Sequence, residues 1–373
     1  MPSKKSFKVC IDTGGTFTDC MIRDQDNVIR ELKSPTTPGD FSQGVLNVLK
    51  DGAASFGMEI EEFLKATEWI VHGTTVATNA LVQRQVAKTA MVTTKGFRDI
   101  IEMRNCSKIE THSIFDGYIP PYEPYIPRYL RYTIEESTLP DGGVAKAVDT
   151  CELDVIVEAV KKENIEAIAV CFVNSYKNTA NEDTAVAYLK KCLPGVYVTG
   201  SAAVLPEMGE YKRFSTCVIS ACLGPIVEKY LTKLEKCLTE LGFSGQLLIV
   251  QSNQFVQSVP SIVSKPVYLS NSGPSSGPVG AARLGEVIGE KNFLIGDMGG
   301  TTWDASMVYD GQVSLVSSTW LGDDKVGIKM AEVVSIGAGG GSIAWINPMG
   351  LLSVGPQSAS SEPGPACYER GGQ

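Results

Sequence analysis

Apolar and polar residues alternate regularly along the first forty residues of the chain. Residues 7–12, 16–22 and 28–32 each show the period of two that is typical of a half-buried strand. This pattern predicts a strand meander. After it, Asp40 offers a helix N-cap, and residues 41–57 have helical spacing that ends in glycine, which predicts a helix.

Helical and strand-like patterns alternate in the next part of the chain. Residues 67–84 are typical of a strand, a Gly-Thr-Thr turn and the start of a helix, and residues 153–201 alternate twice between helix and strand. Such alternation predicts an α/β layer with parallel strands. Between residues 104 and 143 prolines argue against any regular element, and five tyrosines at residues 116–132 indicate that this segment covers a surface or a partner.

A long amphipathic helix is predicted over residues 209–240, with an interruption at Gly224-Pro225. We expect this helix to lead from a first domain, residues 1–200, into a second domain, residues 201–373. The second domain repeats the pattern of the first. Its expected elements are strands at 246–251 and 266–273, a turn at 273–278, a helix from about Val279 and a second meander from residue 295.

The composition is that of a soluble globular protein. The chain has 373 residues, 43% hydrophobic and 20% charged, which suffices for two ordinary domains. No apolar run approaches the roughly 20 residues of a membrane helix, and the N-terminus lacks a signal-peptide core. We therefore predict a cytoplasmic protein without membrane contact. The net charge of −9 argues against a nucleic-acid partner, and the presence of only two histidines argues against a His-rich metal site.

The most informative pattern is one that occurs twice. Residues 9–22 (VCIDTGGTFTDCMI) and 294–308 (LIGDMGGTTWDASMV) share an aspartate, a Gly-Gly-Thr at the same offset and a second aspartate seven residues after the first. Each copy lies between two apolar strands, so each predicts a β-hairpin tipped by glycines. The matching aspartates are Asp12 with Asp297 and Asp19 with Asp304.

Two such hairpins suit phosphate binding. Glycine lets the backbone approach a ligand and present successive N–H groups, and threonine hydroxyls add donors, although a Gly-Gly tip also forms hairpins that have no ligand. Asp12 and Asp297 end the strands before the tips, where they are placed to hold Mg²⁺ directly or through water. The predicted phosphate-binding residues are Thr13, Gly14, Gly15, Thr16 and Thr18 in the first hairpin and Gly299, Gly300, Thr301 and Thr302 in the second.

The doubled Asp-x-Gly-Gly-Thr hairpin resembles the two phosphate motifs of the actin-like ATPase and sugar kinase superfamily. Within it the chain resembles the hydantoinase A and 5-oxoprolinase family, which includes N-methylhydantoinases and relatives of acetone and acetophenone carboxylases. The resemblance implies an α/β, ribonuclease H-like, actin/hexokinase-type two-lobed ATPase fold. It is carried by residues 11–19, 71–84, 90–103, 272–282, 296–304, 335–345 and 364–372.

The resemblance also implies an activity. Members use ATP and Mg²⁺ to phosphorylate the carbonyl oxygen of a cyclic amide such as a hydantoin, 5-oxoproline or a lactam, and a hydantoinase B-type subunit completes the hydrolysis. A related alternative is a ketone carboxylase, which phosphorylates an enol oxygen. The segment HGTTVATNA looks more like the hydantoinase side. A third alternative is a nucleotide-binding subunit without catalysis.

Further candidate residues follow from the same comparison. Gly339, Gly340 and Gly341 precede an apolar strand, and the resemblance gives them a role in lining the nucleotide cleft. His72 lies beside an apolar strand and is either structural or, with Asp12 and Asp297, a candidate catalytic residue. The glycine-rich adenosine-binding motif of the family is expected after residue 373, so the second lobe is expected to be incomplete here.

Overall fold

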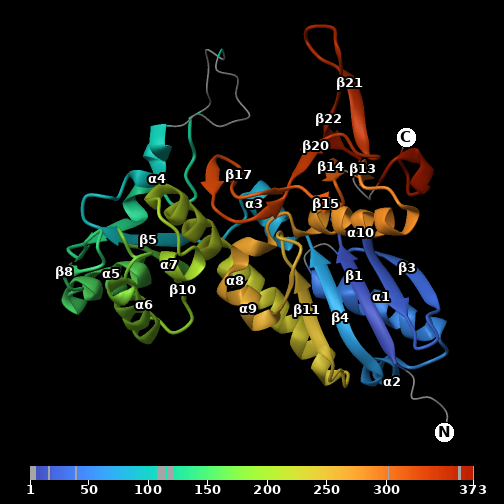
Figure 1. Ribbon diagram of the computed structural model, residues 1–373, viewed down its shortest axis with the longest axis horizontal. Coiled ribbons are helices and arrows are strands. Elements are labelled where there is room, and N and C mark those ends of the chain that lie inside the picture. The colour runs from blue at the N-terminus through green and yellow to red at the C-terminus, as the bar shows by residue number, and fades with distance from the viewer. Residues whose placement is uncertain are drawn as a thin grey trace.

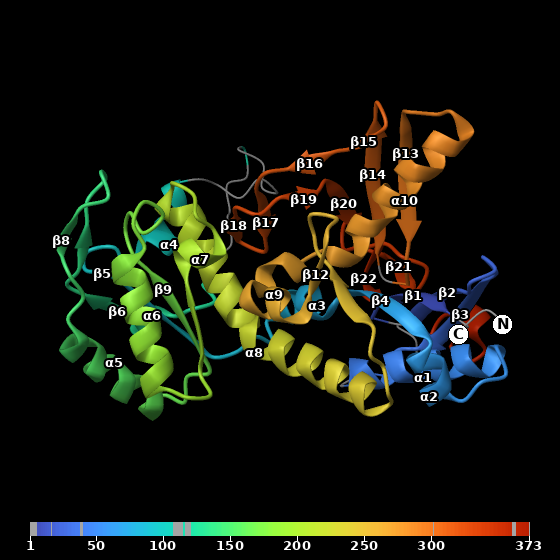
Figure 2. The ribbon, with the colours of Figure 1, turned by 60° about the horizontal axis from the view of Figure 1, so that its bottom comes forward.

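Two β-sheets joined by one long helix organise the chain (Figure 1). The computed structural model describes residues 6–15, 17–37, 40–106, 115, 121–300, 302–359 and 363–372. Helix α8 (Glu210–Glu240) contacts both sheets. Figure 2 shows it passing from the second sheet, at the left, toward α1 (Phe41–Ser55) and the first sheet.

The first sheet has its strands in the order β12-β11-β4-β1-β2-β3. Antiparallel pairing of β1 with β2 and of β2 with β3 confirms the predicted meander, whereas β4 runs parallel to both β1 and β11. Two strands, β11 and β12, come from the predicted second domain, and the boundary near residue 200 stays a prediction. The strands are β1 (Phe7–Thr13), β2 (Phe17–Arg23), β3 (Ile29–Pro35), β4 (Thr67–Thr74), β11 (Gln246–Val250) and β12 (Val256–Ser258).

Different helices cover the two faces of the first sheet. One face packs on α1, on α2 (Ile60–Lys65) and on the C-terminal half of α8, with Val9, Leu49 and Leu231 in its apolar core. α3 (Val76–Val82) follows β4 in the chain. α10 (Ser272–Ile288) contacts β4 and β11 from the other face. This second face therefore meets the segment that leads into the second copy of the motif.

The second sheet is wholly parallel, as the alternation over residues 153–201 predicts, with the order β10-β9-β5-β6. α5 and α6 pack on one face and the N-terminal half of α8 packs on the other. The elements are β5 (Thr89–Thr94), α4 (Ile100–Met103), β6 (Arg131–Ile134), β7 (Ser137–Thr138), β8 (Val144–Lys146), α5 (Thr150–Lys162), β9 (Ala167–Cys171), α6 (Ala180–Cys192), β10 (Tyr197–Gly200) and α7 (Ser201–Val204).

Strand β6 corrects the expectation of no regular element between residues 104 and 143. The chain pairs with β5 after Pro127, because Leu130 and Ile134 are buried and the guanidinium of Arg131 is held by Glu102. Two 3-10 turns, at Arg104–Cys106 and Arg128–Leu130, flank this region. Residues 107–114 and 116–120 lie outside the described residues.

The chain after β11 differs from the sequence prediction in two places. Residues 266–273, expected to be a strand, form a 3-10 turn (Pro266–Leu269) and the start of α10. The expected turn at 273–278 is the beginning of that helix, which starts at Ser272 rather than near Val279. Pro278 lies inside this helix, beyond its first turn, so the helix forms although the missing N–H removes one of its hydrogen bonds.

The C-terminal strands stand above the first sheet in Figure 1, and β13, β14 and β20 form one small sheet with β15. A helix α9 (Val259–Ser264) and a 3-10 turn (Ala366–Tyr368) complete the described elements. The strands are β13 (Phe293–Met298), β14 (Trp303–Tyr309), β15 (Gln312–Val313), β16 (Leu315–Val316), β17 (Thr319–Leu321), β18 (Asp324–Val326), β19 (Met330–Ala331), β20 (Val333–Ile336), β21 (Ser342–Ile346) and β22 (Leu352–Ser358).

Helix α8 is continuous, so the predicted interruption at Gly224-Pro225 is wrong. Apolar residues on its two halves enter two different cores, and this packing outweighs the roughly 3 kcal/mol that an internal proline costs a helix. Among the described residues it is the one helix whose length and composition would allow a membrane crossing, but 78% of its apolar window is buried within the protein. Its apolarity is that of a core helix, and the cytoplasmic location stays a prediction.

We expect Gly224→Ala to destabilise the protein by about 1–3 kcal/mol, because a core position that is already filled would be overpacked. A Cβ at residue 224 would overlap with the ring of Tyr197, whose hydroxyl donates to the carbonyl of Val263 at 2.8 Å. Urea unfolding measures the loss. Gly280→Ala in α10 is the matched control, since no atom lies within 4 Å of its Cβ position. Equal unfolding free energies for the two variants would contradict the prediction.

Asp324 provides a test of pH dependence. Burial raises the pKa of this carboxyl group to about 6, although the hydroxyl of Tyr122 donates to it at 2.8 Å. A raised pKa stabilises the folded state only while the group is protonated, so this contribution is lost as the pH rises from about 4 through about 6. We expect Asp324→Asn to gain about 1–2 kcal/mol relative to the parent between pH 4 and pH 8. Urea unfolding at both pH values would refute this if the difference between the two proteins stays constant.

Candidate active site

The two copies of the motif form hairpins with the same register, as predicted. Asp12 lies opposite Asp19 across β1 and β2, and Asp297 lies opposite Asp304 across β13 and β14. The turns also close alike. The N–H of Gly14 donates to the carbonyl of Phe17 at 3.0 Å, and the N–H of Gly299 donates to the carbonyl of Thr302 at 2.9 Å. The repeat in the sequence is therefore a repeat of backbone structure.

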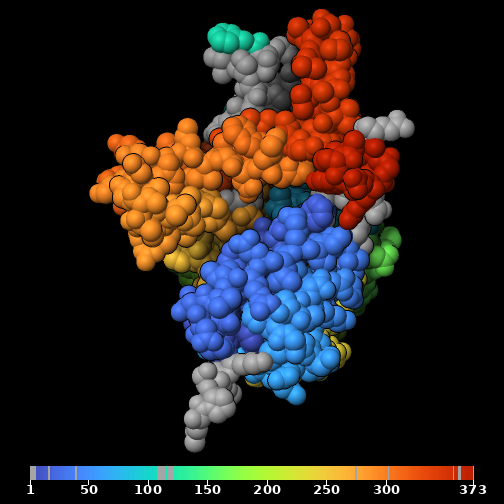
Figure 3. Space-filling view, turned by 90° about the vertical axis from the view of Figure 1, so that its right-hand side faces the viewer, coloured from blue at the N-terminus to red at the C-terminus, as the bar shows by residue number. Residues whose placement is uncertain are grey.

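Asp12 and Asp297 line one cavity of about 560 Å³, which we call the two-aspartate cavity. Its wall includes residues of β1, β2 and β4 and, from α10, Gly273, Ser276 and Gly277. Figure 3 shows the surface hollowed between the first sheet, in blue, and the orange and red residues that follow. The predicted binding of one phosphate–Mg²⁺ group by both hairpins requires that these two aspartates, which are far apart in the chain, lie close together in the fold.

Gly73 makes room for Asp12 on this wall. A Cβ on Gly73 would lie 2.9 Å from Oδ1 of Asp12. Residues 12 and 73 are register partners in the parallel pair β1 and β4, so their side chains share a face of the sheet. Any larger residue at position 73 would press on the carboxylate.

The aspartates of each hairpin differ in their partners. The second aspartate is engaged in both copies, because Lys33 pairs with Asp19 at 2.7 Å and the hydroxyl of Ser335 donates to Asp304. Within the described part of the chain, Asp12 and Asp297 form no ion pair and no side-chain hydrogen bond. Desolvation within the cavity, then the charges of Asp19 and Asp297, raise the pKa of Asp12 above its ordinary value.

This donor set fits a magnesium ion that keeps other ligands. Mg²⁺ is usually held by one or two carboxylates together with waters and phosphate oxygens. The described residues contain no group of three or more His, Cys, Asp or Glu side chains that could hold a metal by themselves. The carboxylates of Asp12 and Asp297, on one wall, would supply the one or two protein ligands that such an ion needs. A bound polyphosphate and water would supply the remaining ligands.

The N-terminus of α10 supplies the complementary potential. The hydroxyl of Ser272 donates to the carbonyl of Thr74 at 2.9 Å and that of Ser275 donates to the carbonyl of Gln251 at 3.1 Å, which fixes the helix start on the ends of β4 and β11. The first turn carries no acidic side chain. The positive end of the helix dipole therefore adjoins the cavity, where it favours an anionic group.

The glycines at the hairpin tips, which are predicted to bind phosphate, are not part of the wall of this cavity. Gly14, Gly15, Gly299 and Gly300 do not line the two-aspartate cavity, although they end the hairpins that do. Thr302 also lies outside its lining, and Thr16 and Thr301 lie outside the described residues.

The third glycine run adjoins the second hairpin. The N–H of Gly340 donates to the carbonyl of Gly299 at 3.0 Å, and the N–H of Gly341 donates to the carbonyl of Gly300 at 2.7 Å. Gly339 precedes them in the same turn, where its N–H donates to the hydroxyl of Ser342. The proximity of this run to the phosphate motif agrees with the sequence argument, and its role stays a prediction.

Thr13, Thr18 and His72 do not line the two-aspartate cavity, so its geometry gives no support to their predicted roles in phosphate binding and catalysis. Neighbouring residues of a strand point to opposite faces, so these three side chains lie on the buried face, away from Asp12 and Gly73. Thr13 is fully buried, and the hydroxyl of Thr18 lies 3.1 Å from that of Thr36. His72 sits within β4 rather than in a turn.

The environment of His72 is structural. Its Nε2 lies 2.7 Å from the hydroxyl of Tyr230 on α8, and the side chain is fully buried. Burial lowers the pKa of the imidazole to about 4, so it is neutral near pH 7 and is held at a helix–sheet contact.

The sequence argument did not select several residues of the cavity wall. These include Gly73, Ser276 and two further acids, Asp19 and Glu31. Alternation along β1 and β2 places Asp19 beside Asp12, so that signal was present in the sequence. Gly73 required knowledge of the parallel pairing between β1 and β4, which no local pattern supplies.

The chain is similar to known proteins along nearly its whole length. Two family models match, one described as the hydantoinase/oxoprolinase N-terminal region over residues 8–193 and one described as hydantoinase/oxoprolinase over residues 213–373. The chain is 32% identical over 370 residues to the caprolactamase subunit alpha of Pseudomonas jessenii, covering 99% of this chain and 53% of that protein. It is 31% identical to the acetophenone carboxylase gamma subunit of Aromatoleum aromaticum, covering 97% and 51%.

Two solved structures with a similar fold come from the same kinds of enzyme as these relatives. The nucleotide-free structure of acetone carboxylase matches with a TM-score of 0.85 at 25% identity, over 99% of this chain and 53% of that one. The crystal structure of the ATP-dependent caprolactamase from Pseudomonas jessenii matches with the same TM-score at 32% identity, over 98% of this chain and 53% of that one. The chain thus spans about half the length of these two curated relatives.

Proposed function

The chain belongs to the hydantoinase/oxoprolinase family. We therefore propose that it is the ATP-binding part of an enzyme that activates the carbonyl oxygen of a cyclic amide by phosphorylation. One observation carries the proposal. Two duplicated hairpins each bring an aspartate that forms no ion pair with the described residues to the wall of one cavity, next to the N-terminus of α10. Uncompensated carboxylates and a positive helix end side by side suit a metal-bound polyphosphate.

The fold supports the same proposal. The first sheet begins with an antiparallel meander and continues with parallel strands, β4 and β11, next to β1. We propose that this sheet and the C-terminal strands are the two lobes of an actin/hexokinase-type ATPase, with the hairpins as phosphate motifs. ATP is then the phosphoryl donor, and Asp12 and Asp297 are the residues that would hold Mg²⁺.

The proposed reaction starts with an amide, whose resonance makes the carbonyl carbon a poor electrophile. The carbonyl oxygen attacks the γ-phosphorus of ATP, a new O–P bond forms, and the bond from that phosphorus to the bridging oxygen breaks, so that ADP leaves with the electron pair. A water molecule then adds to the activated carbon, and the ring C–N bond breaks as the nitrogen takes up a proton, which leaves an acyl phosphate. A second water hydrolyses this acyl phosphate to a carboxylate and phosphate. The protein contributes mainly by positioning and by electrostatics.

Named residues have separate tasks in this scheme. Asp12 and Asp297 fix the position of the metal, which when bound neutralises charge on the phosphate groups. The N–H groups at the start of α10 orient an anionic oxygen, and Gly73 leaves the space that the carboxylate of Asp12 occupies. His72 has no direct task in this scheme, because it is buried on the other face of the sheet.

A ketone carboxylase is the second candidate function. It is favoured by one specific observation, which is the match to acetone carboxylase with a TM-score of 0.85. Both candidates begin with transfer of a phosphoryl group to a carbonyl or enol oxygen, so the two-aspartate cavity serves either. A purely regulatory nucleotide-binding subunit is less well supported, because no described residue forms a hydrogen bond or an ion pair with the carboxylate of Asp12 or Asp297 that would give it a structural role.

A further polypeptide completes the proposed enzyme. The C-terminal strands and the outer side of α10 expose many large apolar residues, among them Val287 (77%), Leu294 (82%) and Leu352 (71%). An accumulation of large exposed apolar residues in one part of a protein is typical of a surface that a partner covers. We propose that this surface meets the sequence that corresponds to the other half of the relatives, and that a hydantoinase B-type subunit joins the same assembly.

The experiment is an assay of ATP turnover with the protein and its partner polypeptides. We expect ADP release that depends on a hydantoin or a lactam and on Mg²⁺. Release that depends on a ketone together with bicarbonate would instead establish the carboxylase. Nucleotide binding without turnover on any of these compounds would refute both enzymatic candidates and leave the regulatory one.

A further inference from the structure

A second cavity of about 390 Å³ lies where α3, the segment before β6 and the hairpin of β17 and β18 meet, and we call it the junction cavity. Small-molecule sites commonly have volumes of this order and commonly lie where separate parts of a fold adjoin. None of the residues assigned above to the two-aspartate cavity lines this one.

The junction cavity adjoins the proposed nucleotide site through the first turn of α10. Asn271, the N-cap residue of α10, lines the junction cavity, whereas Gly273 and Ser276 line the two-aspartate cavity. The N–H of Asn271 donates to the hydroxyl of Thr78 on α3 at 2.9 Å. Thr75, one turn earlier, donates to the carbonyl of Thr13 at the end of β1. One short chain of contacts therefore connects both cavities to the first hairpin.

The wall of the junction cavity is mainly apolar. Leu81 and Val82 of α3 contribute an aliphatic side, and Tyr125, Trp320 and Leu321 contribute two aromatic rings and another aliphatic group. A wall of this kind favours an apolar ring, because binding removes the surface of that ring from water.

The polar groups of the wall favour a neutral ligand. Its two charged side chains have opposite signs, and the guanidinium of Arg84 is already engaged, since it donates to the carbonyl of Glu123 at 2.9 Å and lies 5.1 Å from the ring centre of Tyr125. Asp323 would repel an anion. The side-chain amide of Asn271 has no hydrogen bond within the described part of the chain, and it offers both a donor and an acceptor, as a cyclic amide group does.

We propose that the junction cavity binds the neutral, largely apolar ring of the carbonyl substrate, a lactam without an ionised carboxylate, with its amide group against Asn271. This inference rests on the proposed function for the reaction that follows binding. It separates lactams from 5-oxoproline, which carries a carboxylate at neutral pH. On this wall that carboxylate would meet the carboxylate of Asp323 and a guanidinium, Arg84, that already pairs with Glu123 at 3.7 Å.

The test is direct binding of δ-valerolactam and of 5-oxoproline to the protein, by ligand-detected NMR titration. Val82→Trp fills the cavity from a position where the side chain is 79% exposed, so the fold does not depend on it, and Val155→Trp on α5, 73% exposed, is the matched control. We expect Val82→Trp to weaken lactam binding at least tenfold and Val155→Trp to leave it unchanged. Unchanged lactam binding in Val82→Trp, or tighter binding of 5-oxoproline than of the lactam, would overturn the inference.

Asn271→Gly tests the amide contact without straining the backbone. Asn271 has a φ of +57°, a conformation that glycine adopts freely, and Asn164→Gly, at a φ of +51° on an exposed turn, is the control. We expect only Asn271→Gly to weaken lactam binding, and equal affinities in the two variants would contradict the assigned contact.

Binding of a non-hydrolysable ATP analogue with Mg²⁺ to the same samples separates the two proposals. Loss of lactam binding with nucleotide binding retained supports the junction cavity. A parent protein that binds the lactam at this cavity but does not bind the nucleotide would refute the proposed function and leave the cavity assignment standing.

Discussion

Replacing Asp12 by asparagine is expected to lower the kcat of ATP-dependent phosphoryl transfer by at least about 100-fold. Asparagine preserves the size of the side chain and its place over Gly73, but it removes the charge with which the carboxylate would hold Mg²⁺. Asp297→Asn is expected to have an effect of the same size. Steady-state ADP release in the presence of a lactam measures both variants.

The double variant makes this prediction sharper. If both aspartates hold one ion, removing the second after the first costs little more, so the double variant should resemble either single variant. Asp51→Asn is the control, because Asp51 is exposed on α1, which covers the opposite face of the first sheet. A large loss in Asp12→Asn with normal activity in Asp297→Asn would show that the two hairpins do not serve one site.

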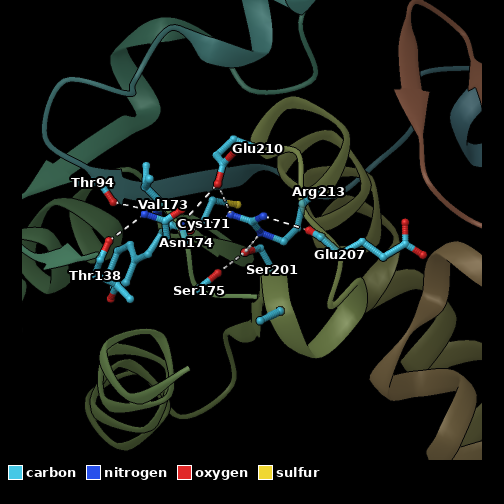
Figure 4. A network of polar contacts seen from close by, with 12 residues as sticks. Thr94, Thr138, Cys171, Val173, Asn174, Ser175, Ser201, Glu207, Glu210 and Arg213 are labelled. Carbon is cyan, nitrogen blue, oxygen red and sulfur yellow. Dashed lines mark hydrogen bonds and ion pairs between the residues drawn. The ribbon is translucent and has the colours of Figure 1, made fainter. Parts of the chain in front are cut away.

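Arg213→Met is expected to destabilise the protein by about 3–5 kcal/mol, because it breaks a buried ionic network by removing its cation. Arg213 is fully buried at the start of α8, and Figure 4 shows its guanidinium between Ser201, Glu207 and Glu210. It donates to the hydroxyl of Ser201 at 3.2 Å, to the carbonyl of Glu207 at 3.0 Å and to the carbonyl of Phe172 at 3.0 Å. It also donates to the carboxylate of Glu210 at 3.1 Å.

Methionine fills similar space but leaves these acceptors without a donor, which is the costly part of the change. Lys212→Met is the matched control, since Lys212 is the preceding residue and its pair with Glu207 lies at the surface, where an ion pair contributes no more than about 1 kcal/mol. Urea unfolding compares the two variants. Similar losses of unfolding free energy would show that the network around Arg213 adds nothing beyond a surface pair.

The pKa of Glu210 gives a second measure of the same network. Burial raises this pKa, but hydrogen bonds from the N–H of Asn174 and from Arg213 outweigh burial and leave it below its ordinary value. A lowered carboxyl pKa stabilises the fold above the unfolded pKa and loses that contribution as the pH falls through the folded one. Arg213→Met should therefore lose less stability than the parent protein when the pH is lowered into this acid range.

Local patterns predicted the parts of the fold that depend on local interactions. The alternation along β1 and β2 and the glycines between them determine a hairpin without help from distant residues, and the same holds for β13 and β14. The shared offset of Asp12 and Asp297 then predicted two equivalent positions. Their meeting at one cavity agrees with that prediction, although only the folded chain could show it.

The errors arose where distant contacts decide the outcome. The face on which His72 lies depends on the pairing of β4 with β1, which places Ile11 beside it and Asp12 beside Gly73. The continuity of α8 through Pro225 depends on two cores that the helix joins. The start of α10 at Ser272 depends on acceptors at Thr74 and Gln251, whereas the local sequence of glycine, proline and serine is typical of a turn.

The shared helix α8 has a consequence for how the protein opens. Its first half packs in the core of the second sheet and its second half packs in the core of the first. Unfolding of either sheet would therefore also remove packing from the core of the other. The two sheets should therefore unfold as one cooperative unit. The backbone amides in the middle of α8 should then exchange with deuterium only through global unfolding, more slowly than those of the exposed strands near the C-terminus.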